Sequence, residues 1–270
     1  MEAYSGFADV YDIFMDETPY EQWRDRIIDA MNTYGISKPA RFSGDVSSLS
    51  EEKILESERN LVLDLGCGTG TLTQMLYDAG YDMIGIDNSS EMLTKAFLKK
   101  EEKGSDIIYL SQDMRQLDLY STIGTVVSVC DSVNYITEPD ELLDVFKKIE
   151  NYLYPGGIFV FDFNTLHKYR DVIGDDVIAE DRDECSFIWD NYYDEETHIN
   201  EYDLTLFIKQ KDGLYKKLTE THYQRGYTIE EMLELLKEAG LKVVKTMDSD
   251  SEGEPTEDSE RIMVIAKKEV

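Results

Sequence analysis

Hydrophobic residues recur with two different periods along the chain, and together they predict alternating strands and helices. Short apolar runs bounded by glycine or polar residues predict buried strands at 61–66, 82–87, 106–110, 125–130, 157–163, 241–247 and 261–267. Between them, apolar residues spaced three or four apart predict amphipathic helices, one of which places Leu72, Met75, Leu76 and Ala79 on a single face. This alternation indicates βαβ units and a parallel sheet covered by helices on both faces.

The pattern changes between residues 176 and 226. Over 201–208, an apolar set alternates with a second set that is mostly polar: Tyr202, Leu204, Leu206 and Ile208 against Glu201, Asp203, Thr205 and Phe207. A period of two predicts antiparallel strands, and the KDG sequence at 211–213 predicts a hairpin turn. We therefore expect a small antiparallel β insertion before the last helix of the α/β pattern.

The first 35 residues have a helical pattern. Phe7, Val10, Tyr11 and Phe14 share one face, and a second helix begins near Pro19 and carries Trp23. Residues 38–50 are rich in Ser, Gly and Pro and predict a loop, and a short helix is expected over 51–58.

The charge of the chain narrows the classes of partner. Its 27 Lys and Arg against 57 Asp and Glu give 270 residues a formal charge of −30. Such a chain repels phosphate backbones and anionic membrane surfaces, so we expect neither a nucleic acid nor a membrane as a partner. No apolar run is long enough to span a bilayer and the N-terminal stretch lacks a signal-peptide pattern, which predicts a cytoplasmic protein.

Cysteine and histidine usage gives no indication of a metal. Cys67, Cys130 and Cys185 include no C-x-x-C pair, which argues against a disulfide framework and a zinc site. No pair of carboxylates or histidines has metal-ligand spacing either, so we expect no metal.

The sequence LVLDLGCGTG at 61–70 carries the main functional signal. It predicts a buried strand that runs into a glycine turn and then a helix N-terminus, a combination that brings backbone N–H groups close to a ligand. Gly66, Gly68 and Gly70 form G-x-G-x-G rather than the dinucleotide fingerprint G-x-G-x-x-G. The spacing therefore favours S-adenosylmethionine over a nicotinamide or flavin dinucleotide.

Two carboxylates accompany this turn. Asp64, two positions before Gly66, suits a ligand with an ammonium group and no phosphate; its alternative role is to cap the turn. Asp87 ends the second strand, 21 residues after Gly66, where a carboxylate accepts hydrogen bonds from ribose hydroxyls of either cofactor.

The motifs LVLDLGCGTG, GIDNSSEML, SQDMRQLDL, VVSVCDSVNYI and LYPGGIFVFDFN follow one another over about residues 61–165. In this order they resemble the class I S-adenosylmethionine-dependent methyltransferases. The segments AYSGFADVYDIFMDETPYEQW and THYQRGYTIEEM resemble a bacterial subgroup related to glycine and sugar N-methyltransferases.

The resemblance implies an α/β, Rossmann-like fold with a seven-stranded, mostly parallel sheet, its last strand antiparallel, helices on both faces and a β insertion forming a lid. It implies three parts: N-terminal helices over the cofactor site at 1–60, the methyltransferase domain at 61–167 and 226–270, and the substrate lid at 168–225.

The resemblance also assigns cofactor contacts. The residues it implicates are Tyr11, Trp23, Asp64, Gly66, Cys67, Gly68, Asp87, Asn88, Met92, Asp113, Met114, Cys130 and Asp131. Gly66, Cys67 and Gly68 would line the methionine part, Asp87 would hold the ribose, and Asn88, Met92, Asp113 and Met114 would surround the adenine. Cys130 and Asp131 would face the methyl-donor end, and Tyr11 and Trp23 would close over the cofactor. For Tyr11, Trp23 and Met92 the alternative is core packing, and for Asp113 it is turn capping.

The acceptor side is less defined. Methyl transfer from a sulfonium mainly requires alignment, with a general base only where the nucleophile arrives protonated. His222, Asp131 and Tyr135 are the candidate catalytic residues, and His222 is included because an unperturbed histidine side chain titrates near neutral pH. We expect transfer to a small molecule, N-methylation being favoured over O-methylation, by a monomer or homodimer. The alternatives are a nicotinamide-dependent oxidoreductase and a non-catalytic S-adenosylmethionine-binding protein.

Overall fold

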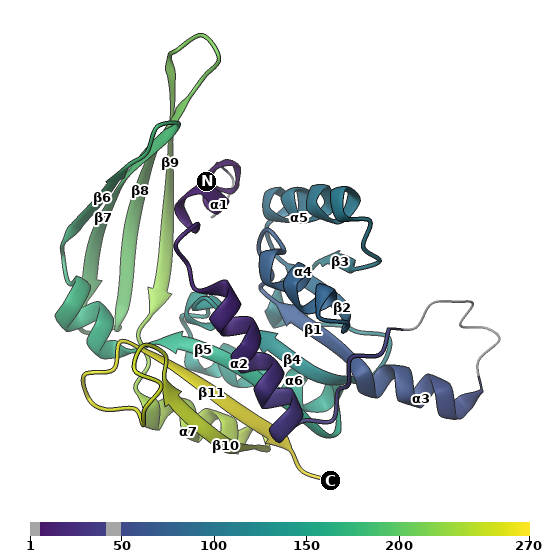
Figure 1. The fold of residues 1–270 in the computed structure, drawn as a ribbon. Helices are drawn as coiled ribbons and strands as arrows, with labels where there is room; N and C mark the ends of the chain where they lie inside the picture. The colour runs from purple at the N-terminus through teal and green to yellow at the C-terminus, as the bar shows by residue number, and fades with distance from the viewer. Residues whose placement is uncertain (1–5, 42–49) are drawn as a thin grey trace.

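The computed structural model describes residues 6–41 and 50–270 (Figure 1). Most of the loop predicted at 38–50 lies outside the described residues, because 42–49 are among those not described. Within the described ranges, no helix has the length and apolarity needed to cross a membrane.

A seven-stranded sheet forms the centre of the molecule in the order β10-β11-β5-β4-β1-β2-β3. Its strands are β1 (Leu61–Leu65), β2 (Asp82–Asp87), β3 (Ile108–Ser111), β4 (Ile123–Ser128), β5 (Leu153–Asn164), β10 (Leu241–Asp248) and β11 (Arg261–Lys268). Neighbouring strands from β3 to β5 pair in parallel, whereas β11 is antiparallel to both β5 and β10. This confirms the predicted Rossmann-like sheet.

Helices cover both faces of this sheet (Figure 1). They are α1 (Tyr11–Phe14), α2 (Tyr20–Thr33), α3 (Glu51–Asn60), α4 (Thr71–Asp78), α5 (Ser90–Lys103), α6 (Pro139–Tyr152) and α7 (Ile229–Glu238). One hydrophobic cluster joins α6 and α7 to one face through residues such as Phe146 and Phe161, and another joins α2, α4 and α5 to the opposite face through residues such as Ile27 and Leu76. The core of this part of the molecule therefore consists of two layers, one on each face of the sheet.

A second sheet, with the order β6-β7-β8-β9, stands apart from the first (Figure 1). Its antiparallel strands are β6 (Val177–Asp181), β7 (Cys185–Asp194), β8 (Ile199–Lys209) and β9 (Tyr215–Arg225). The predicted β insertion is present, and the period of two is visible in β8, where Tyr202, Leu204 and Leu206 are buried. A π-helical turn at Lys168–Ile173 connects it to β5.

The N-terminal segment, which we define as residues 6–16, lies between the two sheets. Val10 is buried in a cluster with Leu204 and Leu206, and Phe14 contacts Phe187 edge-on with ring centroids 4.9 Å apart. The segment begins with a single turn of 3-10 helix, Phe7–Asp9, before α1. Phe7, Val10 and Phe14 therefore pack on the four-stranded sheet, whereas Tyr11, which was predicted to share their face, is not part of this cluster.

Several strand boundaries differ from the sequence prediction, most of them by one or two residues. β4 ends at Ser128, because Cys130 and Asp131 adopt left-handed backbone angles of φ 61° and 51° that a strand does not accommodate. β3 begins at Ile108 rather than at residue 106, and β5 begins at Leu153 rather than at residue 157. Each difference is in strand length; the strand order is unaffected.

Helix α7 has a capping box that fixes where the chain returns to the main sheet. The Thr228 hydroxyl accepts from the Glu231 N–H at 3.1 Å, and the Glu231 carboxylate accepts from the Thr228 N–H at 2.8 Å. Replacing Thr228 with Ala is expected to lower the free energy of unfolding by about 1 kcal/mol, measured by urea denaturation. Thr228→Ser retains the hydroxyl and should unfold like the wild type; equal losses in both variants would contradict this role.

Candidate active site

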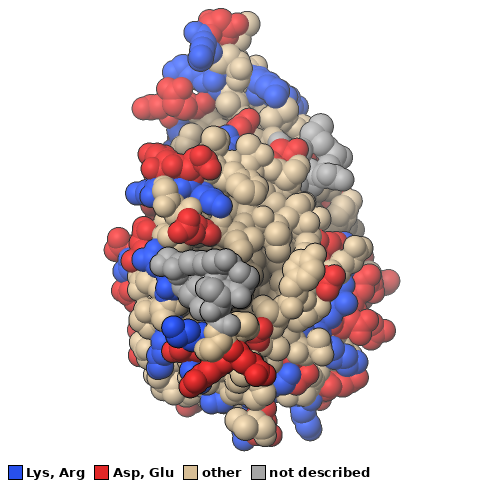
Figure 2. Space-filling model, turned by 90° about the vertical axis from the view of Figure 1, so that its right-hand side faces the viewer, with Lys and Arg blue, Asp and Glu red and all other residues tan. Residues whose placement is uncertain are grey.

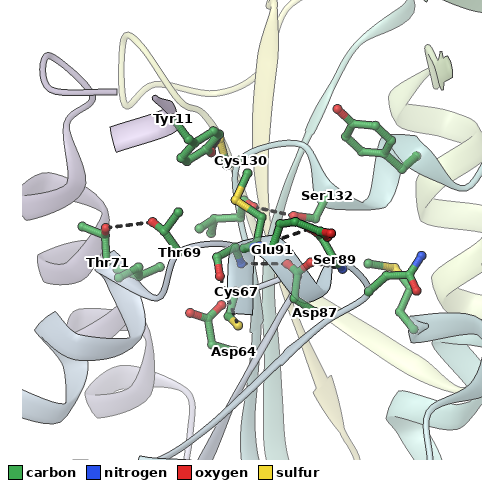
Figure 3. Close-up of a pocket in the computed structure, with 18 of the residues that line it drawn as sticks. Tyr11, Asp64, Cys67, Thr69, Thr71, Asp87, Ser89, Glu91, Cys130 and Ser132 are labelled. Atoms are coloured by element: carbon green, nitrogen blue, oxygen red, sulfur yellow. Dashed lines mark hydrogen bonds between the residues drawn. The ribbon is translucent and has the colours of Figure 1, made fainter. Parts of the chain in front are cut away.

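A large cavity, with a volume of about 450 Å³, opens at the carboxyl ends of β1, β2 and β4. Its walls are formed by Tyr11, Tyr20, Asp64, Gly66, Cys67, Gly68, Thr69, Thr71, Leu72, Asp87, Asn88, Ser89, Glu91, Met92, Met114, Val129, Cys130, Ser132 and Tyr135. Figure 3 shows Asp64 and Asp87 in the lower part of the view and Tyr11 and Cys130 above them. Lys and Arg are absent from these described lining residues, so the wall charge comes from carboxylates.

A smaller cavity of about 190 Å³ adjoins the large one. Gly66, Asp87, Asn88, Met114 and Tyr135 line both. Its remaining walls are Leu65, Ile86, Gln112, Asp113, Arg115 and Ile136. Asp87 therefore lies where the two cavities meet, a position suited to the central part of an extended ligand.

The glycine turn brings backbone to the floor of the large cavity. At Gly66, φ is +81° and a Cβ would lie 2.6 Å from the Ser132 hydroxyl, so no side chain fits there. At Gly68, φ is +54° and a Cβ would meet no atom within 4 Å, because the position faces open space. The turn is held by the N–H groups of Gly66 and Cys67, which both donate to the Ile86 carbonyl.

Asp64 is a buried carboxylate on the cavity wall. Its Oδ2 accepts from the Thr73 hydroxyl at 2.6 Å, and only 2% of the residue is exposed. Burial raises the pKa of Asp64 to about 7, although the hydrogen bond from Thr73 by itself lowers it. A ligand ammonium beside Asp64 would offset the cost of burying the charge, whereas a pyrophosphate would increase it.

Asp87 is fixed by the turn that it supports. Its carboxylate accepts from the Gly68 N–H at 2.7 Å and from the Ser89 N–H at 2.8 Å. Burial raises its pKa, and these backbone hydrogen bonds partly counteract that effect. The hydrogen bonds fix the orientation of a carboxylate that faces both cavities.

The predicted adenine residues are found around both cavities. Asn88 and Met92 line the large one, Asp113 lines the small one, and Met114 lines both. The Asp113 side chain accepts from the Arg115 backbone and also pairs with the Arg115 guanidinium at 2.6 Å, a hydrogen bond that lowers the pKa of Asp113. Asp113 thus also caps a short helical turn, the alternative that its sequence position left open.

The Cys130–Asp131 turn separates the large cavity from a buried charge cluster. Arg261 donates to Asp131 at 2.6 Å and to Asp162 at 3.2 Å, and Gln224 donates to the other Asp131 oxygen at 2.6 Å. Asp131 does not line either cavity, so the structure turns its carboxylate away from the position expected for it. Burial opposes the ionisation of Asp131, but Arg261 and Lys168 hold its pKa below the usual value.

The Cys130 side chain does face the large cavity, 3.7 Å from the Tyr11 hydroxyl. Burial, reinforced by the nearby Asp131 charge, raises the pKa of its thiol to about 12. The thiol is therefore protonated at neutral pH and does not act as a nucleophile.

The structure separates the two aromatic residues predicted to close the site. Tyr11 lines the large cavity, whereas Trp23 packs in the hydrophobic core, edge-on to Tyr20 and with Arg261 5.9 Å from its ring centroid. Tyr20 occupies the cavity wall instead. Trp23 lies with Ile27 on the inward face of α2, whereas Tyr20 is the first residue of the helix and lines the cavity from that end.

His222 is buried on β9 and lines neither cavity. Its Nδ1 lies 3.1 Å from the hydroxyl of Tyr135, which does line the large cavity. The structure therefore brings two of the three candidate catalytic residues into contact and places Asp131 in a separate cluster.

Several cavity residues were not predicted as ligand contacts: Tyr20, Thr69, Thr71, Leu72, Ser89, Glu91, Val129 and Ser132. Thr69, Thr71, Ser89 and Glu91 follow the glycine turn or the second strand within a few residues, so proximity to the motifs was an available signal. Tyr20 carries no such signal, because only the path of α2 brings it to the cavity.

Comparison with known proteins agrees with this geometry. A protein-family model described as a methyltransferase domain matches residues 62–157. YqeM from Bacillus subtilis (strain 168), provisionally named a methyltransferase, is 32% identical over 266 residues, which cover 98% of this chain and 97% of the relative.

Solved structures extend the likeness to the whole fold. An S-adenosylmethionine-dependent methyltransferase from Clostridium acetobutylicum ATCC 824 superimposes with a TM-score of 0.80 at 28% identity and covers all of both chains. The sugar N-methyltransferase KedS8 from Streptoalloteichus sp ATCC 53650 superimposes with a TM-score of 0.69 at 16% identity, covering 97% of this chain and 93% of its own, which shows the shared fold.

The chain therefore belongs to the class I S-adenosylmethionine-dependent methyltransferases, and S-adenosylmethionine is its cofactor. The site fits that cofactor, because a carboxylate-lined cavity suits a cationic ligand without phosphate better than a dinucleotide. The family sets aside the nicotinamide-dependent alternative. Among the described residues, no group of three or more His, Cys, Asp and Glu is arranged to hold a metal ion.

Proposed function

We propose that this methyltransferase transfers the methyl group to the nitrogen of a small-molecule amine. The observation that carries the proposal is the charge of the large cavity, whose walls include Asp64, Asp87 and Glu91 and, among the described residues, no Lys or Arg. An anionic acceptor would be repelled by these walls, whereas an ammonium would be attracted. The fold shared with a sugar N-methyltransferase is consistent with an amine acceptor.

The cofactor would extend across both cavities. Asp64 would pair with its ammonium group, and Gly66, Cys67 and Gly68 would contact the methionine part through the backbone. Asp87 would accept from the ribose hydroxyls at the junction. Asn88, Met92, Asp113 and Met114 would surround the adenine.

Aromatic residues would form the acceptor side. Tyr11, Tyr20 and Tyr135 line the large cavity near Cys130, and tyrosine faces attract an organic ammonium through cation–π contacts. On the side of the molecule drawn in Figure 2, uncharged residues form a band with Lys, Arg, Asp and Glu interspersed at its edges. The four-stranded sheet would act as the lid on this side.

The chemistry requires alignment and removal of one proton. The bound cofactor supplies an electrophilic methyl group on a sulfonium, a good leaving group. Tyr135 and His222 would remove a proton from the arriving ammonium, which exposes the nitrogen lone pair. We assign no part in this to Asp131, because its carboxylate is bound to Arg261 and Gln224.

Isothermal titration with S-adenosylhomocysteine, with NADH as the control, tests the cofactor site first. A panel of aliphatic and aromatic amines, matched with phenols, is then incubated with S-adenosylmethionine and analysed by mass spectrometry for the mass of one added methylene. Methylated amines would support the proposal, and methylation confined to phenols would contradict it. Cofactor binding without turnover of any compound would instead support a non-catalytic cofactor-binding protein.

Asp87→Asn provides a test of the ribose assignment. The variant retains one carbonyl oxygen for the turn and loses one acceptor, so S-adenosylhomocysteine is expected to bind about tenfold more weakly in the same titration. Asp78→Asn, on α4 and outside both cavities, is the control with the same change of charge. Unchanged affinity in Asp87→Asn would refute the assignment.

A further inference from the structure

A buried carboxylate on β9, Glu220, contacts two parts of the molecule at once. Its side chain is fully buried. One oxygen accepts from the backbone N–H groups of Gly6 and Phe7, the latter at 3.0 Å, and the other oxygen lies 3.3 Å from His222 Nε2. Glu220 therefore joins the beginning of the N-terminal segment to the candidate base.

The contacts continue from His222 to the large cavity. His222 Nδ1 lies 3.1 Å from the Tyr135 hydroxyl, which is 2.6 Å from the Tyr202 hydroxyl. The Tyr202 ring stacks on the His222 imidazole with centroids 4.7 Å apart and an interplanar angle of 8°. This stacking and the two hydrogen bonds hold the imidazole in one orientation.

An ionised Glu220, the form favoured by the two backbone N–H groups that donate to it, determines which imidazole nitrogen carries the proton. An ionised carboxylate only accepts hydrogen bonds, so Nε2 must carry the hydrogen and Nδ1 of the neutral ring must be bare. A bare Nδ1 accepts the proton of the Tyr135 hydroxyl. The opposite tautomer would present an N–H to Tyr135 and would be unable to accept a proton from it.

We propose that Glu220 is a positioning residue that couples closure of the N-terminal segment to a proton relay running from Tyr135 to His222. The relay rests on the proposed amine acceptor. An ammonium N–H bond breaks as its proton passes to the Tyr135 oxygen, while the Tyr135 proton passes to His222 Nδ1. The amine keeps its electron pair, and the imidazolium later releases one proton to water.

The coupling follows from where the N-terminal segment is held. On its other side it pairs with α5 through Asp9 and Lys95 at 2.7 Å and through Asp12 and Lys99 at 2.8 Å. The segment thus bridges α5 and the four-stranded sheet, with Tyr11 facing the cavity. In the closed position the Gly6 and Phe7 N–H groups donate to one Glu220 oxygen, while the other oxygen lies against His222 Nε2.

Nitrogen-15 NMR of the histidines tests the orienting role without a substrate, because the chain has only three histidines. At pH 8 the wild type is expected to show His222 protonated at Nε2, with assignment by His222→Asn. Glu220→Gln places either an amide NH₂ or an amide oxygen toward Nε2. In the first orientation His222 switches to the Nδ1–H tautomer; in the second, the NH₂ group faces the Gly6 and Phe7 N–H groups and loosens the segment.

Hydrogen exchange of the amides of Gly6 and Phe7 detects the second orientation, with an expected acceleration of about tenfold or more. Glu201→Gln is the control, because its side chain lies on β8, opposite Tyr223 and on the other face of the sheet from Tyr202. It should change neither the tautomer nor the exchange. A Glu220→Gln protein with the wild-type tautomer and wild-type exchange would overturn the proposal.

Kinetics then separate the relay from the cofactor site. With a methylated amine in hand, Glu220→Gln is expected to reduce kcat by about 100-fold, while S-adenosylhomocysteine affinity stays within about twofold of wild type. Loss of affinity equal to the loss of kcat would indicate a structural defect and overturn the relay. Failure of the wild type to methylate any amine would count against the proposed function alone, because the tautomer is measured without substrate.

Discussion

Replacing Asp64 with Asn is expected to weaken S-adenosylhomocysteine binding by about 10- to 100-fold at pH 8. The carboxylate is buried on the cavity wall, where its charge would pair with the ligand ammonium, and a hydrogen bond between charged groups contributes about 1.5–3 kcal/mol. Asparagine has a similar shape but no charge. Isothermal titration of both proteins measures the effect directly.

The pH dependence gives a second test of the same residue. Because burial raises the pKa of Asp64 to about 7 in the unliganded protein, wild-type affinity should rise by up to about tenfold per unit as the pH increases toward 7, then level off. The affinity of Asp64→Asn should lack this rise with pH. Asp82→Asn, at the amino end of β2 opposite the cavity, is the control and should bind like the wild type. Equal affinities of wild type and Asp64→Asn across this range would refute the ammonium assignment.

The pH dependence of folding stability has the opposite sign to the pH dependence of cofactor affinity. Asp64 has a folded pKa above its ordinary value of 3.8, so the folded protein without ligand binds more protons than the unfolded chain between these values. This contribution to stability is therefore present at acid pH and lost as the pH rises toward 7. Above pH 7, unliganded Asp64→Asn should melt at a higher temperature than the wild type, measured by differential scanning calorimetry.

Replacing Arg261 with Met is expected to lower the free energy of unfolding by about 3–5 kcal/mol at pH 7, measured by urea denaturation. Arg261 is the buried cation that pairs with both Asp131 and Asp162, and removing one partner leaves buried carboxylates uncompensated. The same change should reduce cofactor affinity, because the Asp131 pair stabilises the left-handed turn that brings Cys130 to the cavity.

The stability loss in Arg261→Met should shrink with acidification. In the wild type, Arg261 keeps the pKa of Asp131 below its usual value, so this stabilisation is present at neutral pH and is lost only as the pH falls through the lowered pKa. Burial already raises the pKa of Asp162, and without the guanidinium it would raise the pKa of Asp131 as well, so protonation of both carboxylates at acid pH removes the buried charge. Lys242→Met, which breaks an exposed ion pair with Glu269, is the control with an expected change below about 1 kcal/mol. A loss in Arg261→Met as small as in the control would show that the cluster contributes little.

Much of the cofactor side was predictable from sequence because it is built from short, local motifs. Asp64, Gly66 and Gly68 belong to one strand and its following turn, and Asp87 ends the next strand. Parallel strands place their carboxyl ends at one edge, so these residues meet whenever the sheet forms. The roles of these residues as cofactor contacts remain predictions, to be tested by the variants above.

The acceptor side was not predictable to the same degree because its contacts span distant parts of the chain. Tyr135 follows β4, whereas His222 and Glu220 lie on β9, and the Glu220 partners Gly6 and Phe7 lie more than 200 residues away. Asp131 was wrongly predicted for a related reason. Its place in the motif predicted a side chain in the cavity, but its carboxylate instead pairs with Arg261, which is distant in sequence.

The amino-acid sequence by itself determined the Rossmann-like sheet, the β insertion and the glycine turn of this methyltransferase, because strand and helix periods and glycine turns are local properties of the chain. The tertiary structure alone decided that Trp23 is a core residue while Tyr20 faces the cavity, and that Glu220 joins the N-terminal segment to His222. These outcomes depend on how α2 and the two sheets are oriented in space. That orientation follows from the packing of the whole core, which no single stretch of sequence contains.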